Sequence, residues 1–247
     1  MALATQPRIG FGITTESPSD PTQAAGLAGG FFVFFSLEMK RLVFANLKGG
    51  CGKTTSCLCL GMHLAKVGAL DVACLDLDED QQTAFNMIDN LGGLIRDYDP
   101  NESQKVMLAR AAAGGRLVPE YLLVDTPAGL PKGKTLHEID EADLIVVPAR
   151  PSGGDWNSTF TFLDHLPKRQ RKRSRLLFTN VMPNTKLARD LPEMRRYCAK
   201  EYGVMAFTTT MNLRTGYAMA MTSGWSALPK AARVELAALA TQVATAA

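Results

Sequence analysis

The sequence predicts an α/β fold in which a mostly parallel, twisted sheet carries helices on both faces. Two observations predict it. Short apolar runs alternate along the chain with longer segments of helical period. The runs are also almost continuous in Val, Leu, Ile and Phe, as expected of strands that are covered on both faces. Strands that alternate with helices in this way are typical of parallel sheets with helical crossovers.

The strands are expected in chain order wherever such an apolar run is short. They cover residues 41–46, 71–77, 121–125, 143–148, 175–181 and 204–207. Helices are expected in the longer amphipathic segments that separate or follow these runs. They cover residues 54–67, 102–113, 156–166, 185–201, 214–223 and 229–246. Because no repeat and no second boundary interrupts this alternation, we expect a single domain over residues 39–247.

The amino-terminal residues 1–38 differ from the rest of the sequence. Residues 14–30 are small, polar and interrupted by Pro and Gly, without helical or strand period. We therefore expect residues 1–38 to be a flexible extension. Met39 stands directly before the first expected strand, so it is an alternative natural start, and a regulatory tail is the other interpretation of the extension.

Composition excludes several classes of protein. The 247 residues include 27 Lys and Arg against 24 Asp and Glu, and 21% are charged, which argues against a disordered or fibrous chain. No apolar run reaches the roughly 20 residues needed to span a bilayer. The 5 cysteines lack the spacing of a disulfide framework, which indicates reduced thiols and a cytoplasmic protein.

The segment between the first strand and the first helix carries the strongest functional signal. It reads Lys-Gly-Gly-Cys-Gly-Lys-Thr-Thr over residues 48–55. Backbone N–H groups of such a turn and of the following helix N-terminus converge on one point, which is an anion site. The ordinary phosphate-loop pattern places a glycine five residues before Gly52, where this chain has Leu47. The residues expected to bind ATP here are Gly49, Gly50, Cys51, Gly52, Lys53, Thr54 and Thr55, with Thr54 also a Mg²⁺ ligand.

This loop resembles the deviant Walker A motif of the ParA/MinD family of P-loop ATPases. The resemblance implies that Lys48 is the signature lysine, which reaches the nucleotide of a second subunit, while Lys53 serves its own subunit. Two ATP molecules would then be enclosed between two copies of the chain. ATP binding would act as a dimerisation switch.

Later motifs extend the resemblance over about residues 40–246. By that resemblance Asp78 positions the attacking water and Asp125 holds Mg²⁺, directly or through water. Asp155 belongs to a Pro-Ser-x-x-Asp loop, Asn180 contacts adenine, and Arg214 begins a late element of the family. For Asp78, a helix N-cap is the alternative interpretation. The family's Asp-Leu-Asp segment is followed here by Glu-Asp-Gln, which leaves the role of its glutamine, Gln81, open.

A dense basic run favours a DNA-binding member of the family. Six of the eight residues 168–175 are basic, and such a run can contact phosphate backbones without reading sequence. A solvated loop that only aids solubility is the alternative. The tail 229–247 is Ala-rich with little basic character and is expected to pack as a closing helix, not to bind a membrane. The expected DNA contacts are Lys168, Arg169, Arg171, Lys172, Arg173, Arg175 and Arg214.

The resemblance therefore implies a short ParA-type partition ATPase. It would bind ATP and Mg²⁺, form a homodimer in the ATP state and bind nonspecific double-stranded DNA on the nucleoid. A centromere-binding, ParB-like adaptor would stimulate hydrolysis, which would be slow without it. The alternatives are a positioning ATPase for a protein cargo, a MinD-like spatial regulator and a scaffold that no longer hydrolyses ATP.

Overall fold

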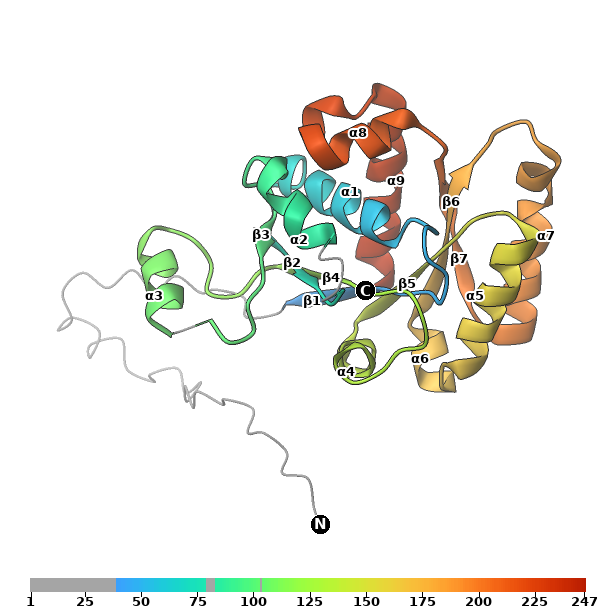
Figure 1. Ribbon diagram of the computed structural model, residues 1–247, viewed down its shortest axis with the longest axis horizontal. Coiled ribbons are helices and arrows are strands. Elements are labelled where there is room, and N and C mark those ends of the chain that lie inside the picture. Colours follow the sequence, from blue (N-terminus) through green and yellow to red (C-terminus); the bar gives the residue numbers. More distant parts are fainter. Residues whose placement is uncertain (1–38, 79–82, 103) are drawn as a thin grey trace, which may run out of the picture. The chain divides into compact units, whose positions relative to one another are not determined.

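The computed structural model describes residues 39–78, 83–102 and 104–247 (Figure 1). These residues contain one seven-stranded sheet with helices on both faces. The expected extension 1–38 and the residue Gln81 lie outside the described residues.

All strand pairs in the described sheet are parallel, and the strand order is β3-β2-β4-β1-β5-β6-β7. The first strand thus lies in the middle of the sheet, and all carboxyl ends meet at one edge. The strands are β1 (Lys40–Phe44), β2 (Val72–Asp76), β3 (Arg96–Asp97), β4 (Tyr121–Asp125), β5 (Leu144–Ala149), β6 (Ser174–Val181) and β7 (Met205–Asn212).

The helices form two groups, one on each face of the sheet. The core on one face contains residues of α1, α2, α8 and α9, and the core on the other contains residues of α4, α5 and α7. The α-helices are α1 (Lys53–Lys66), α2 (Thr83–Ile88), α3 (Gln104–Ala112), α4 (Lys134–Glu141), α5 (Gly153–His165), α6 (Lys168–Lys172), α7 (Lys186–Tyr202), α8 (Thr215–Ser223) and α9 (Lys230–Ala246). Two short 3₁₀ turns cover Asp89–Leu91 and Trp225–Ala227.

The central strand shows why the apolar runs are continuous. Leu42 and Phe44 of β1 lie in the core against α1 and α9, while Val43 and the following Ala45 lie in the opposite core. Successive side chains of a strand point to opposite faces, so a strand covered twice needs apolar residues at every position. The fold class expected from the sequence is confirmed.

The sequence-based assignment missed several short elements. β3 has two residues, and α2, α4 and α6 have between five and eight, too few to display a clear hydrophobic period. The last strand is longer than expected and runs on through Thr208, Thr209 and Thr210. These residues are polar because β7 lies at the edge of the sheet, where side chains reach solvent. No helix among the described residues has the length and apolar character needed to cross a membrane.

Candidate functional site

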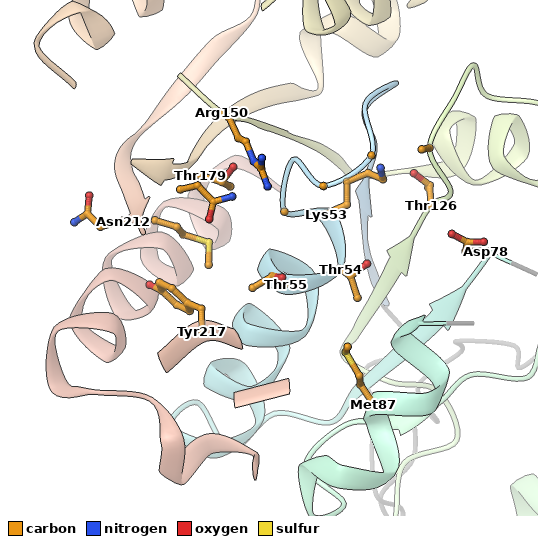
Figure 2. A pocket seen from close by; sticks show the side chains of 16 residues that line it. Lys53, Thr54, Thr55, Asp78, Met87, Thr126, Arg150, Thr179, Asn212 and Tyr217 are labelled. Carbon is orange, nitrogen blue, oxygen red and sulfur yellow. The ribbon is translucent and has the colours of Figure 1, made fainter. Parts of the chain in front are cut away.

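A cavity of about 440 Å³ opens at the edge where the carboxyl ends of the strands meet (Figure 2). Such a position is usual for ligand sites in parallel α/β sheets. One wall is the loop after β1 together with the first turn of α1, and the opposite wall is formed by the end of β7 and the start of α8. Among the residues expected to bind ATP, those that line the cavity are Gly49, Gly50, Gly52, Lys53, Thr54, Thr55 and Asn180.

The loop after β1 depends on glycine at two positions. Gly50 and Gly52 have φ of 70° and 92°, values that residues with a side chain rarely adopt. A Cβ on Gly52 would also stand 3.3 Å from the side chain of Thr179 on β6. The Thr179 hydroxyl donates a 2.6 Å hydrogen bond to the carbonyl of Cys51, which fixes the loop against β6.

The helix that follows the loop presents its N-terminus to the cavity. Lys53 is the first residue of α1 and is 7% exposed, and its Nζ donates to the Lys48 carbonyl at 3.1 Å. Cys51 is 1% exposed, its thiol donates to the same carbonyl, and burial raises the pKa of that thiol. The Cys51 side chain therefore does not line the cavity, and only its backbone can contribute to a ligand site.

Thr54 and Asp125 form a pair that fits a hydrated Mg²⁺. The Thr54 hydroxyl donates a 2.6 Å hydrogen bond to Oδ2 of Asp125, which is 2% exposed at the end of β4. Within the described part of the chain, Oδ1 of Asp125 has no hydrogen-bond partner. Burial raises the pKa of this carboxyl to about 7. A buried carboxylate oxygen without a partner is costly, and a cation or its water shell would satisfy it.

The raised pKa of Asp125 makes a prediction for the metal-free protein. Because the folded state holds this proton more tightly than the unfolded state, whose carboxyl has a pKa near 3.8, stability is lost as pH rises from about 4 to about 7. Asp125→Asn removes this loss. In EDTA, the variant should gain up to about 1.4 kcal/mol over wild type per pH unit until about pH 7, and nothing further above it. The measurement is the free energy of unfolding of both proteins, from denaturant titrations at pH values from 5 to 8. A difference between variant and wild type that does not change with pH would contradict the prediction.

Two aspartates, Asp76 and Asp78, lie at the carboxyl end of β2. The Asp76 Oδ2 accepts hydrogen bonds from the N–H groups of Ala84 (2.8 Å) and Phe85 (3.1 Å), so Asp76 caps α2. Its Oδ1 accepts from the N–H of Asp78 at 2.9 Å. Asp78 lines the cavity near Thr126 (Figure 2). The N-terminus of α2 is thus capped by Asp76, at the end of β2.

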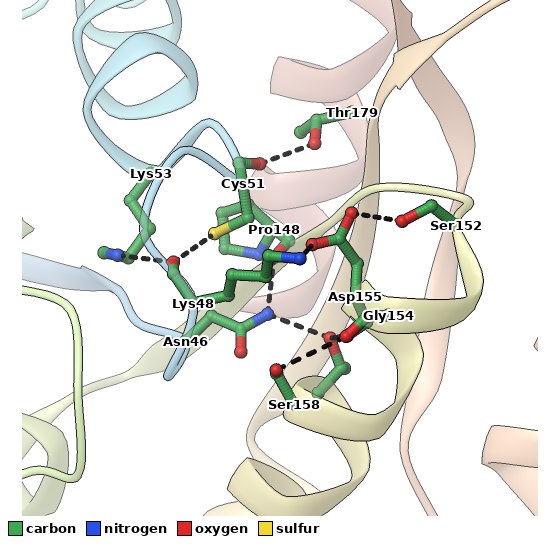
Figure 3. A network of polar contacts seen from close by, with 11 residues as sticks. Asn46, Lys48, Cys51, Lys53, Pro148, Ser152, Gly154, Asp155, Ser158 and Thr179 are labelled. Atoms are coloured by element: carbon green, nitrogen blue, oxygen red, sulfur yellow. Dashed lines mark hydrogen bonds and ion pairs between the residues drawn. The ribbon is translucent and has the colours of Figure 1, made fainter.

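Lys48 forms an ion pair within its own chain (Figure 3). Its Nζ lies 2.6 Å from Oδ1 of Asp155 in the first turn of α5, and the other carboxylate oxygen accepts from the hydroxyl of Ser152. Asp155 is 4% exposed. Burial acts to raise the pKa of Asp155, but Lys48 and Ser152 outweigh it and lower that pKa below its usual range.

Comparison with known proteins agrees with this geometry. A protein-family model described as "ATPase MipZ" matches residues 40–98. The "Maintenance of carboxysome distribution protein A" of Halothiobacillus neapolitanus is 27% identical over 198 residues, which cover 78% of this chain and 88% of that protein. The MinD septum site-determining protein of Pyrococcus horikoshii, complexed with Mg-ADP, has a TM-score of 0.56 at 14% identity, covering 83% and 96% of the two chains. This chain has the fold of the P-loop ATPases of the ParA/MinD type and is similar to them in sequence.

A second relative, the "Virulence plasmid ParA family protein pGP5-D" of Chlamydia psittaci, is 32% identical over 134 residues. That match covers 47% of this chain and 50% of the relative. Solved structures with this fold include a plasmid partition protein of Borrelia burgdorferi bound to AMPPNP and the Pyrococcus protein complexed with Mg-ADP.

Some of the residues around the cavity were not expected from the sequence. Arg150 follows β5 and lines the cavity, and its Nη2 lies 3.5 Å from the position of a Cβ on Gly50. Arg150 could have been predicted to line the site, because it directly follows a strand whose carboxyl end lies next to the loop. Met211 and Tyr217 line the opposite wall, and no local pattern marks them in the sequence.

The structure changes the interpretation of the basic residues. The run 168–175 is not a loop, because α6 occupies its first five residues. Arg173 donates to the carbonyls of Asp140 and Ala142 at the end of α4, and Arg175 donates to those of Lys172 and Ser174. These two guanidinium groups thus hold backbone carbonyls of their own chain.

Within α6, three basic residues remain exposed. They are Lys168, Arg169 and Lys172, whereas Arg171 is half-buried. The Arg169 side chain is 72% exposed and lies 3.4 Å from the carboxylate of Asp140.

Arg214 is not part of this surface. Its guanidinium forms an ion pair with Glu235 on α9, with Nη2 and Oε1 2.6 Å apart. The structure gives Arg214 a partner in its own chain, and we leave it out of the proposed DNA contacts.

Proposed function

We propose that this chain is a ParA-type partition ATPase that dimerises with ATP and Mg²⁺ and binds nonspecific DNA in that state. The observation that carries the proposal is the loop after β1, which brings Lys53, the N-terminal turn of α1 and the Thr54 that pairs with Asp125 to one cavity. In this proposal Lys53 binds phosphates, Thr54 and Asp125 hold Mg²⁺, and Asn180 contacts the base. Asp78 would orient the attacking water.

Two copies would meet at the edge of the sheet that holds the cavity. Lys48 lies at that edge, and its side chain is 40% exposed although paired with Asp155. In the proposed dimer each Lys48 leaves Asp155 for the phosphates of the other subunit, where it balances charge that builds up during hydrolysis. Hydrolysis would be slow until an adaptor, of the centromere-binding ParB type, acts on the dimer.

The proposed DNA surface lies at the opposite end of the strands, where their amino ends meet. α6 ends directly before β6, and Ser174 at the start of β6 pairs with Ile145 near the start of β5. β6 has 8 residues, which correspond to roughly 25 Å between α6 and the cavity. Each protomer would therefore bring its own basic surface, and ATP would strengthen DNA binding by joining two such surfaces.

Charge removal on α6 tests this surface. We expect Lys168→Gln/Lys172→Gln to weaken binding of nonspecific duplex DNA and to flatten the slope of log K against log salt by about 2 per protomer, because each lysine releases about one counterion. The measurement is fluorescence anisotropy over a salt series with ATP.

A matched control removes the same charge at the opposite edge of the sheet. Lys186 and Lys230 are exposed first residues of α7 and α9, and Lys186→Gln/Lys230→Gln should leave the slope near that of wild type. If the control pair alone flattened the slope, DNA would bind at the cavity edge. An unchanged slope in both variants would show that the charge of α6 only aids solubility.

A second candidate is a positioning ATPase whose cargo is a protein complex. The carboxysome distribution protein matches more of this chain, 78%, than the plasmid protein, 47%, and this favours it. The two candidates differ in the adaptor. A partition adaptor also binds a DNA site of its own, whereas the adaptor of a protein cargo need not. Stimulation of ATP hydrolysis by the product of the adjacent gene, with nonspecific DNA present, would identify the adaptor, and its binding to a DNA site would then separate the two candidates.

A further inference from the structure

A single carboxylate on α9 gathers hydrogen bonds from the end of β7 and the start of α8. Oε2 of Glu235 accepts from the N–H of Asn212 (3.1 Å) and from the Tyr217 hydroxyl (2.7 Å). Oε1 accepts from Nδ2 of Asn212 (2.7 Å) and from Nε and Nη2 of Arg214 (3.1 and 2.6 Å). The Glu235 side chain is 13% exposed. These donors are 18 to 23 residues away in the sequence, so the contacts are tertiary.

β7 needs this support because it is an edge strand. Asn212 pairs with Val181 of β6, and on its other side no strand of the described sheet is present to accept its N–H. Glu235 takes the place of that missing strand. Seven residues later on α9, the side chain of Gln242 accepts the N–H of Thr208 at 2.7 Å, so α9 holds the edge at two points, two helical turns apart.

Only one of these two points borders the cavity. Asn212, Tyr217 and Met211 line it. Figure 2 shows Asn212 and Tyr217 across the cavity from Lys53 and Asp78. If phosphates lie on the loop after β1, the sugar and base extend toward this wall. Gln242 holds β7 at Thr208 and Thr209, which do not line the cavity.

We propose that Glu235 is a positioning residue for the nucleotide, which fixes the wall of β7 and α8 against which the base end of ATP packs. This inference rests on the proposed nucleotide site. Glu235 itself touches no ligand in this arrangement. It acts through Asn212 and Tyr217, while Arg214 compensates its buried charge.

The test separates the base end of the ligand from its phosphate end. Glu235→Ala should weaken binding of ATP by about tenfold and raise KM similarly, because the wall is no longer pre-organised. Binding of inorganic tripolyphosphate, which has no base, should stay within about twofold of wild type, as should kcat at saturating ATP. Glu235→Gln keeps a hydrogen-bond acceptor, so its affinity for ATP should lie between those of wild type and Glu235→Ala.

Two controls match the lost interactions. Glu138→Ala breaks an ion pair of 3.3 Å with Arg41, and the Glu138 side chain, at 12% exposed, is about as buried as that of Glu235. This pair lies at the amino end of β1, away from the cavity. Gln242→Ala releases β7 away from the cavity. Both should bind ATP as wild type does.

Each other outcome overturns the inference. If Glu235→Ala lost affinity for ATP and for tripolyphosphate equally, the cause would be general destabilisation. The same would follow if the control variants lost as much affinity for ATP as Glu235→Ala does. Unchanged ATP binding would remove Glu235 from the site. If wild type bound neither ligand, the proposed nucleotide site itself would fail, which is a distinguishable result.

Discussion

Lys53→Ala is expected to abolish measurable binding of ATP at micromolar concentrations. Lys53 is buried at the start of α1, and apart from the cavity its ammonium contacts the Lys48 carbonyl. In the proposed complex it forms charge-assisted hydrogen bonds to two phosphates. Losing them costs about 3 kcal/mol or more, which is a factor of roughly 100 in affinity. Titration calorimetry with ATP and Mg²⁺ measures the loss.

Asp78→Ala is the matched variant for this experiment. Asp78 lines the same cavity, but its proposed role is to orient water, so the variant should bind ATP about as tightly as wild type and fail to hydrolyse it. Its thermal stability and that of Lys53→Ala should both stay close to wild type. If Lys53→Ala retained affinity within about threefold, the cavity would not be the phosphate site.

Much of the fold could be predicted because the strands are covered twice. β1, β4 and β6 are nearly continuous apolar runs, and each emerged within two residues of its observed bounds. β3 could not be predicted, because two residues carry no period and its pairing with β2 is a tertiary event. α6 was taken for a loop because its helical turn is held by contacts with α4, which lies about 30 residues earlier.

The candidate site divides in the same way. The loop 48–55 could be predicted because turn, glycines and lysines are contiguous, and the structure brings Asp78, Asp125 and Asn180 to the same edge. The wall of Met211 and Tyr217 could not, since its support comes from Glu235 on α9 and is created only by folding. The contact of Arg214 with Glu235 could not be predicted either, because the two residues are 21 positions apart and meet only through folding.

Lys48→Gln should prevent the ATP-dependent dimer. In a symmetric dimer each substitution counts twice, so two charge-assisted contacts to phosphate are lost and the dimer should weaken by about 100-fold or more. Light scattering with a slowly hydrolysed ATP analogue measures it. The variant also leaves the buried Asp155 without its cation. This costs about 1 kcal/mol of stability, a small value because water screens the partly exposed ammonium.

Asp155→Asn separates the two effects. It breaks the same 2.6 Å contact but leaves Lys48 free to reach a second subunit, so this variant should dimerise with ATP at least as well as wild type. The double variant Lys48→Gln/Asp155→Asn removes the unpaired buried charge and should recover the stability of the fold, yet remain monomeric. If Lys48 acted only as the structural partner of Asp155, both single variants would lose the dimer equally and the double variant would regain it. A normal dimer of Lys48→Gln would exclude a role of this ammonium at the other subunit's nucleotide.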